Sequence, residues 1–116
     1  MEVRAVYALI GEDFDLAVSR MVKEERIAKY LALFVKDTSF NDLERSFEND
    51  DMETAFRAAH TLKGVCANLG MDKLGGMASI LTEDLRNGKD IIHAREYFPE
   101  FKEEFVKVIR IIEDAR

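Results

Sequence analysis

One short stretch of the chain, residues 58–70, combines side chains that could carry out phosphoryl chemistry. When this stretch is drawn as a helix at about 100° per residue, His60 lies opposite an apolar stripe and faces outward. An ordinary imidazole titrates at about pH 6.5, so at pH 7 it is mostly neutral and has one ring nitrogen free to attack. Lys63 occupies a neighbouring position on the helix surface, where its charge favours a negatively charged adduct on His60. These residues predict a nucleophilic histidine that accepts a phosphoryl group. The predicted buried stripe consists of Ala55, Ala58, Leu62, Val65 and Leu69.

The same helix face carries two features that favour the approach of a partner. Gly64 follows His60 by one turn, although glycine in the middle of a helix costs roughly 1 kcal/mol relative to alanine. The missing side chain leaves room for another molecule. Phe56 is predicted on the exposed side, as a docking contact would be. Arg57 and Ala67 share this surface and are expected to contact the partner.

Composition limits where the phosphate can come from. The 116 residues contain no G-x-x-x-x-G-K-[ST] and no G-x-G-x-x-G loop, so any phosphate chemistry must take its phosphate from a partner. The net charge of −6 argues against binding to nucleic acid or to an anionic membrane. No apolar run approaches the roughly 20 residues of a membrane span, and no secretory signal is visible. We therefore expect a cytoplasmic location.

Helical periodicity runs through nearly the whole chain, and alternating β-branched runs are absent. Helices are predicted over residues 2–10, 12–21, around 27–35, 39–49, 50–69, 72–87 and from 90 to near the C-terminus. Ser39 with Asp42 is interpreted as a capping box, Asp50 as the cap of the histidine-bearing helix and Asp90 as the cap of the last helix. Pro99 either kinks the last helix or begins a new one. The short connections predict an all-α fold, an antiparallel up-and-down four-helix bundle with extra short N-terminal helices, in one domain over residues 1–116.

The stretch from Ala59 to Gly64, continued by residues 68–70, closely resembles the H-x-x-K-G motif of the histidine-containing phosphotransfer (HPt) domains of two-component phosphorelays. In that family the motif lies on a helix of a four-helix bundle and is followed by a hydrophobic–glycine turn. Residues 11–20, the Asp50-Asp51 pair and the turn at residues 87–90 also resemble family features. The resemblance therefore covers nearly the whole chain.

The resemblance implies that His60 accepts phosphate from the aspartyl-phosphate of a receiver domain and passes it to another receiver. Lys63 would steady the phosphoryl oxygens, and Gly64 would leave room for the docking receiver. Some members place a hydrogen-bonding side chain and an arginine on the following helix, and these positions correspond here to Thr82 and Arg86. Thr82 is shorter than the glutamine that some members carry.

The implied partners are response-regulator receiver domains and a hybrid sensor histidine kinase. The chain would be a monomeric phosphocarrier and not an enzyme with its own ATP site, and Mg²⁺ would be bound by the receiver. Because receiver pockets are acidic, attraction would have to come locally from Arg57, Lys63 and Arg86.

Two other functions are compatible with the same residues. A non-catalytic helical adaptor would bind receivers without accepting phosphate, and the phosphoacceptor domain of a chemotaxis-type kinase would lie beside a kinase domain in a longer gene. The other candidate residues favour ordinary roles. His93 is expected to be a surface or capping residue and Cys66 a partly buried packing residue. Two histidines and one cysteine without ligand spacing do not indicate a metal site.

Overall fold

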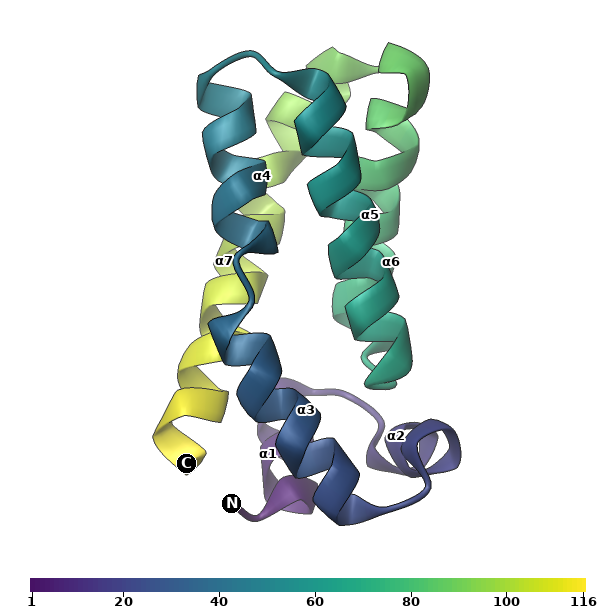
Figure 1. Ribbon diagram of the computed structural model, residues 1–116, viewed down its shortest axis with the longest axis vertical. Helices are drawn as coiled ribbons and strands as arrows, with labels where there is room; N and C mark the ends of the chain where they lie inside the picture. The colour runs from purple at the N-terminus through teal and green to yellow at the C-terminus, as the bar shows by residue number, and fades with distance from the viewer.

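The computed structural model describes residues 1–116 and contains seven α-helices, one short 3₁₀ turn and no strand. Helices α4, α5, α6 and α7 run alternately up and down side by side (Figure 1), which confirms the predicted all-α antiparallel bundle. None of the helices has the length and apolar character needed to cross a membrane. In chain order the elements are α1 (Val3–Ile10), α2 (Phe14–Met21), α3 (Glu24–Lys36), α4 (Ser39–Glu48), α5 (Met52–Asn68), α6 (Asp72–Leu85), η1 (Arg86–Gly88) and α7 (Ile91–Ala115).

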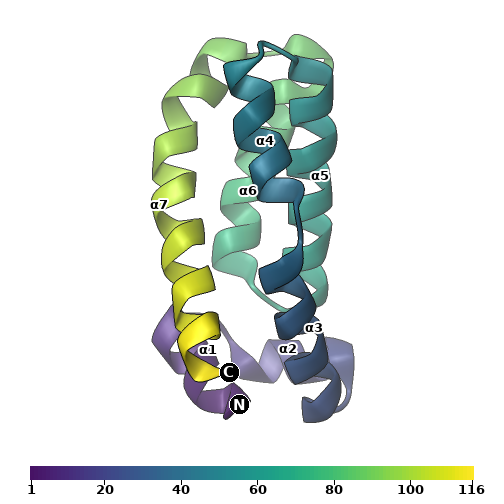
Figure 2. The same cartoon turned by 60° about the vertical axis from the view of Figure 1, so that its left-hand side comes forward.

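One of the four rods of the bundle is made of two helices. Helix α3 lies below α4 along nearly the same line, and the two meet at Asp37 and Thr38 (Figure 2). The Asp37 carboxylate accepts a hydrogen bond of 2.6 Å from the backbone N–H of Ser39. The predicted capping box of Ser39 and Asp42 is therefore wrong, because the cap comes from the residue two positions earlier and not from the Ser39 hydroxyl.

Apolar side chains at helical spacing fill the interior between the rods. Phe40 of α4 and Phe105 of α7 stack with their ring centroids 4.3 Å apart, and Phe34 of α3 meets Phe105 edge-on at 5.6 Å. Such aromatic pairs stabilise a core beyond the apolar area that they bury. They join the broken rod α3–α4 to α7.

The short N-terminal helices close the lower end of the bundle in Figure 1. The buried Tyr7 hydroxyl of α1 donates a 2.6 Å hydrogen bond to the carbonyl of Leu69, just after α5. The Glu12 carboxylate accepts from the backbone N–H groups of Lys73 and Leu74 at 3.0 and 2.9 Å, which satisfies two free donors at the start of α6. Both contacts hold the turn between the histidine-bearing helix and α6.

The start of α5 differs by one residue from the sequence-based prediction. Asp51, and not Asp50, caps the helix, because its carboxylate accepts from the backbone N–H of Thr54 at 3.1 Å and from the Thr54 hydroxyl at 2.7 Å. Asp50 instead has a positive φ of 58° and forms an ion pair with Arg95 of α7. The capping pattern identified the right region but not the right aspartate.

Backbone geometry also explains where α6 ends and how α7 accommodates Pro99. Helix α6 ends at Leu85 and not at the predicted Asn87, because Asn87 adopts a left-handed conformation with φ 53°. Helix α7 continues through Pro99, which lies on the exposed side of the helix. The carbonyl that a backbone N–H at Pro99 would have bonded loses its helical partner.

His93 links the start of α7 to α6. Its backbone N–H is capped by Asp90 at 3.0 Å, as predicted, and its Nδ1 lies 2.5 Å from Oδ2 of Asp84. The hydrogen bond to Asp84, together with the charge of that carboxylate, raises the pKa of His93 above its ordinary value. A raised folded-state pKa means that the pair stabilises the fold fully below about pH 6.5 and less as pH rises through the folded-state value.

We expect His93→Gln to lower the free energy of unfolding more at pH 5.5 than at pH 9. Urea denaturation of both proteins at the two pH values measures this difference. Asp84→Asn serves as the matched control, because it removes the same interaction from the other side and should lose the same pH dependence. An equal loss at both pH values would show that the ion pair does not act in this way.

Candidate functional site

His60 lies near the middle of α5 on its exposed side, and the opposite side of the helix is buried. Ala55, Ala58, Leu62 and Leu69 are buried, as the predicted stripe requires. Val65 is only half-buried. No hydrogen bond within the chain engages the ring nitrogens of His60, so both remain free for an outside reactant.

Helix α6 covers more of α5 than the stripe predicts. Ala59 and Cys66 are fully buried, and a Cβ atom on Gly75 would lie only 3.1 Å from the Cβ of Cys66. Glycine at this position therefore allows the two helices to approach closely. Burial raises the pKa of the Cys66 thiol to about 12. Cys66 was predicted to be partly buried and is instead a fully buried core residue, on a different side of α5 from His60.

An aromatic ring separates His60 from the end of α6. The Phe56 ring lies one turn before His60, with its centroid 5.9 Å from that of the imidazole and the two planes 21° apart. The guanidinium carbon of Arg86 lies 5.1 Å from the Phe56 centroid on the side of α6. Phe56 was predicted on the exposed side of α5; it is half-buried, because it packs against the core as well as against these two groups.

Lys63 and Arg86 flank this surface from two helices, together with a carboxylate that the sequence did not single out. Arg86 donates to both oxygens of Glu83, from Nε at 3.3 Å and from Nη2 at 3.2 Å. These hydrogen bonds, with the charges of Arg86 and then of Lys63, lower the pKa of Glu83. Lys63 is half-buried and forms no ion pair. The spacing of three residues between Glu83 and Arg86 is the sequence signal that could have revealed the pair.

The remaining predicted docking residues lie on the exposed face of α5. Arg57 is held by Glu53 at 2.9 Å and by the Thr54 hydroxyl at 3.2 Å. Ala67 is exposed near the end of the helix. Because carboxylates pair with both Arg57 and Arg86, the local positive charge around His60 is weaker than the sequence alone suggests.

The surface at Gly64 is open, whereas the side chain of Thr82 is buried. A Cβ atom on Gly64 would meet no atom within 4 Å, so the surface beside His60 is open. Thr82 is fully buried, and its hydroxyl donates a 2.8 Å hydrogen bond to the carbonyl of Ala78. The geometry therefore does not support the expected supporting role of Thr82, whose short side chain bonds its own helix and does not reach the surface.

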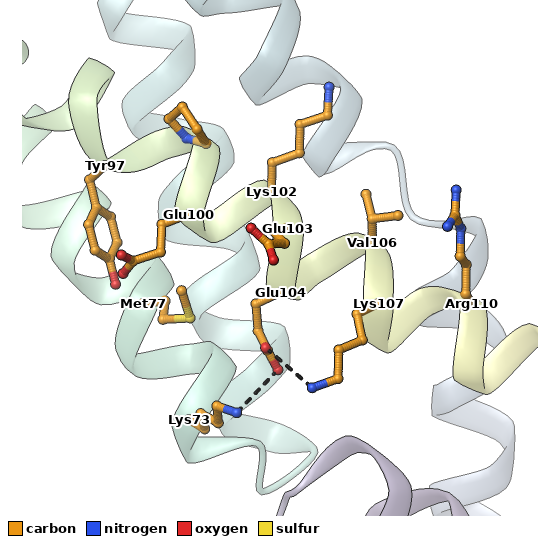
Figure 3. A pocket seen from close by; sticks show the side chains of 11 residues that line it. Lys73, Met77, Tyr97, Glu100, Lys102, Glu103, Glu104, Val106, Lys107 and Arg110 are labelled. Carbon is orange, nitrogen blue, oxygen red and sulfur yellow. Dashed lines mark ion pairs between the residues drawn. The ribbon is translucent and has the colours of Figure 1, made fainter.

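The largest hollow of the molecule lies elsewhere. It is a shallow groove of about 950 Å³ along α6 and α7, and none of its lining residues belongs to α5. Figure 3 shows Glu104 between Lys73 and Lys107, which lie at 3.5 and 3.8 Å. The single carboxylate is paired with both lysines, and the groove does not converge on a reacting group. No group of three or more His, Cys, Asp or Glu side chains is placed to hold a metal ion.

The chain matches the family model of the Hpt domain over residues 30–111. Comparison with curated proteins finds no match, and comparison with solved structures finds none. The all-helical bundle that carries an exposed histidine is thus an Hpt fold, and the chain belongs to the Hpt domain family. Helices α1 and α2 and the first part of α3 lie before the matched residues.

Membership in this family implies histidine phosphotransfer in two-component phosphorelays. Hpt domains are phosphocarriers and not catalysts, and they interact with receiver domains and kinases.

Proposed function

We propose that His60 is the phosphoacceptor, and that it takes a phosphoryl group from the aspartyl-phosphate of one receiver domain and passes it to the aspartate of another. The observation that carries this proposal is the exposed imidazole of His60 next to the open surface at Gly64. The buried opposite face of α5 fixes this orientation, because rotating His60 inward would bring the apolar stripe into water.

The proposed transfer consumes no reactant other than the phosphorylated receiver. A neutral ring nitrogen of His60 attacks the phosphorus, the new N–P bond forms, and the bond between phosphorus and the aspartate oxygen breaks. The aspartate leaves as a carboxylate with the electron pair, and the proton on the other ring nitrogen stays on the imidazole, which becomes cationic. The second transfer is the reverse of this step with another receiver. We assign Mg²⁺ to the receiver, where it would stabilise the charge on the phosphoryl oxygens.

The neighbours of His60 have separate proposed roles. Lys63 is free of ion pairs and is the side chain best placed to bind the phosphoryl oxygens as they arrive. Phe56 fixes one side of the imidazole and offers part of its ring to a docking receiver. Arg57 and Ala67 extend this docking surface along α5. Arg86 already donates from Nε and Nη2 to Glu83, so a phosphoryl group on His60 would compete with Glu83 for these donors.

A transfer assay separates this proposal from the adaptor alternative. The chain is mixed with a receiver domain that has been phosphorylated with acetyl phosphate and Mg²⁺, and the phosphate on the chain is then measured. A phosphocarrier gains phosphate that is labile in acid and stable in base, as phosphohistidine is. An adaptor binds the same receivers but gains none, and that result would reject the proposal.

Gly64→Ala is expected to stabilise the fold and yet slow the transfer. Alanine in mid-helix is favoured over glycine by about 1 kcal/mol, and the structure has open space for its methyl group. The same methyl group occupies space that the receiver needs. Thermal unfolding and transfer rates from a phosphorylated receiver measure the two effects.

Gly76→Ala is the matched control. Gly76 is also a mid-helix glycine with nothing within 4 Å of an added Cβ, but it lies on α6. Its alanine variant should gain similar stability and transfer phosphate at the normal rate. Equal transfer rates for the two variants would show that Gly64 does not provide access for the partner.

A further inference from the structure

Glu83 holds Arg86 in a two-pronged ion pair, and the Arg86 guanidinium lies over the Phe56 ring that stacks on His60. The two hydrogen bonds, at 3.3 and 3.2 Å, use the forked geometry with which a guanidinium binds a carboxylate. Both side chains are about half exposed, at 52% for Glu83 and 45% for Arg86. Exposed ion pairs contribute little to stability, so this pair can exchange one partner for another.

Arg86 is linked to His60 through Phe56, and it lies at an open part of the surface. Its guanidinium lies over Phe56, and the other contact of that ring is the imidazole of His60. Arg86 also lines an open hollow of about 420 Å³ between the start of α5 and the end of α6. Because Arg86 follows the last residue of α6, its backbone has left the helix and its side chain is not fixed by helical packing.

A phosphoryl group on His60 would compete with Glu83 for the same cations. It carries close to two negative charges and three acceptor oxygens, and a guanidinium binds it with the same forked geometry. Lys63 is the second cation in question, since its charge already acts on Glu83. The other charged groups at this end are Glu53 with Arg57 on α5, and Lys89 in the turn before α7.

We propose that Glu83 is a positioning residue that withholds Arg86 from the phosphoryl group of phosphorylated His60, and so limits how strongly this chain retains phosphate. This inference rests on the proposed function of His60. In the unphosphorylated chain Glu83 keeps Arg86 over Phe56. After phosphorylation Arg86 divides its time between the carboxylate and the phosphoryl oxygens, which leaves the phosphate easier to pass on.

The test uses phosphoramidate, which phosphorylates histidine without a receiver. The His60 nitrogen forms the new N–P bond as the P–N bond of phosphoramidate breaks and ammonia leaves. The pH titration of the phosphohistidine ³¹P signal is then recorded for the wild-type chain, Glu83→Gln, Arg86→Gln and the double variant. Glu53→Gln is the matched control, because it also removes one exposed carboxylate paired with an arginine, but that arginine is Arg57.

Glu83→Gln should lower the midpoint of the phosphoryl titration by about half a pH unit, because Arg86 then favours the doubly charged form. In the equilibrium between the chain and a receiver, the phosphorylated form of the chain should also be favoured roughly two-fold, because Arg86 binds the phosphoryl group only while His60 carries it. In the Arg86→Gln background the same substitution should change little, since its effect acts through Arg86.

Equal titration midpoints for wild type and Glu83→Gln would overturn the proposal. An equal shift in Glu53→Gln would also overturn it, because a general loss of negative charge would then explain the result. So would a full shift in the Arg86→Gln background, because Glu83 would then act directly on the phosphoryl group. Failure of the proposed function is a separate outcome, in which phosphorylated receivers never load His60 although phosphoramidate does.

Discussion

His60→Gln is expected to abolish the uptake of phosphate from a phosphorylated receiver. Glutamine has a similar polarity and reach but no ring nitrogen that can form a stable N–P bond. His60 is exposed and makes no hydrogen bond within the chain, so the substitution should leave the free energy of unfolding nearly unchanged. Transfer of labelled phosphate, followed by gel electrophoresis under alkaline conditions, measures the loss.

His93→Gln is the matched control, since the chain has only two histidines. His93 is paired with Asp84, and this contact joins the start of α7 to α6. This variant should take up phosphate at the normal rate. If His60→Gln still takes up phosphate and His93→Gln does not, the phosphoacceptor is His93 on α7, and our assignment of His60 is wrong.

Gly70→Ala should produce the largest loss of stability among small substitutions in the chain. Gly70 has a φ of 68°, a conformation that costs other residues roughly 1–2 kcal/mol. In addition, its Cβ would lie 2.6 Å from the backbone nitrogen of Ala17 in α2. Backbone cannot rotate away as a side chain can, so α2 would have to move. We expect a total loss of about 3 kcal/mol, measured by urea denaturation.

Gly11→Ala separates the two causes. Gly11 has a similar φ of 73°, but nothing lies within 4 Å of an added Cβ. Its alanine variant should lose only about 1 kcal/mol, which is the conformational part. Equal losses at the two positions would show that the close approach of α2 to Gly70 contributes nothing.

Much of the fold follows from local sequence signals. Gly11, Gly70 and Gly88 directly follow the predicted ends of three helices, and each of these residues has a positive φ in the structure. The apolar periodicity predicts the helices and the bundle, because period and burial are linked. The contact between Gly70 and Ala17 could not be predicted in this way, since it joins two segments distant in sequence.

The same distinction applies to the candidate site, where some residues could be placed from the sequence and others only from the packing of the helices. The outward direction of His60 follows from the helical arrangement of its own segment, and the structure confirms it. Residues on other elements required the structure. Thr82 faces inward because α6 is rotated to pack Gly75 against Cys66, and the role of Glu83 depends on where the end of α6 places Arg86. Sequence patterns fix the faces of single helices, but the packing between helices determines which side chains meet.

A two-step chase of labelled phosphate tests the central claim most directly. A phosphorylated receiver first loads the chain, the receiver is removed, and a second unphosphorylated receiver with Mg²⁺ is added. Our account predicts that the label lies on His60 after the first step and leaves it for the second receiver after the second. Label that never reaches His60, or that stays on it in the presence of every receiver domain tested, would contradict the proposal that this chain carries phosphate between receivers.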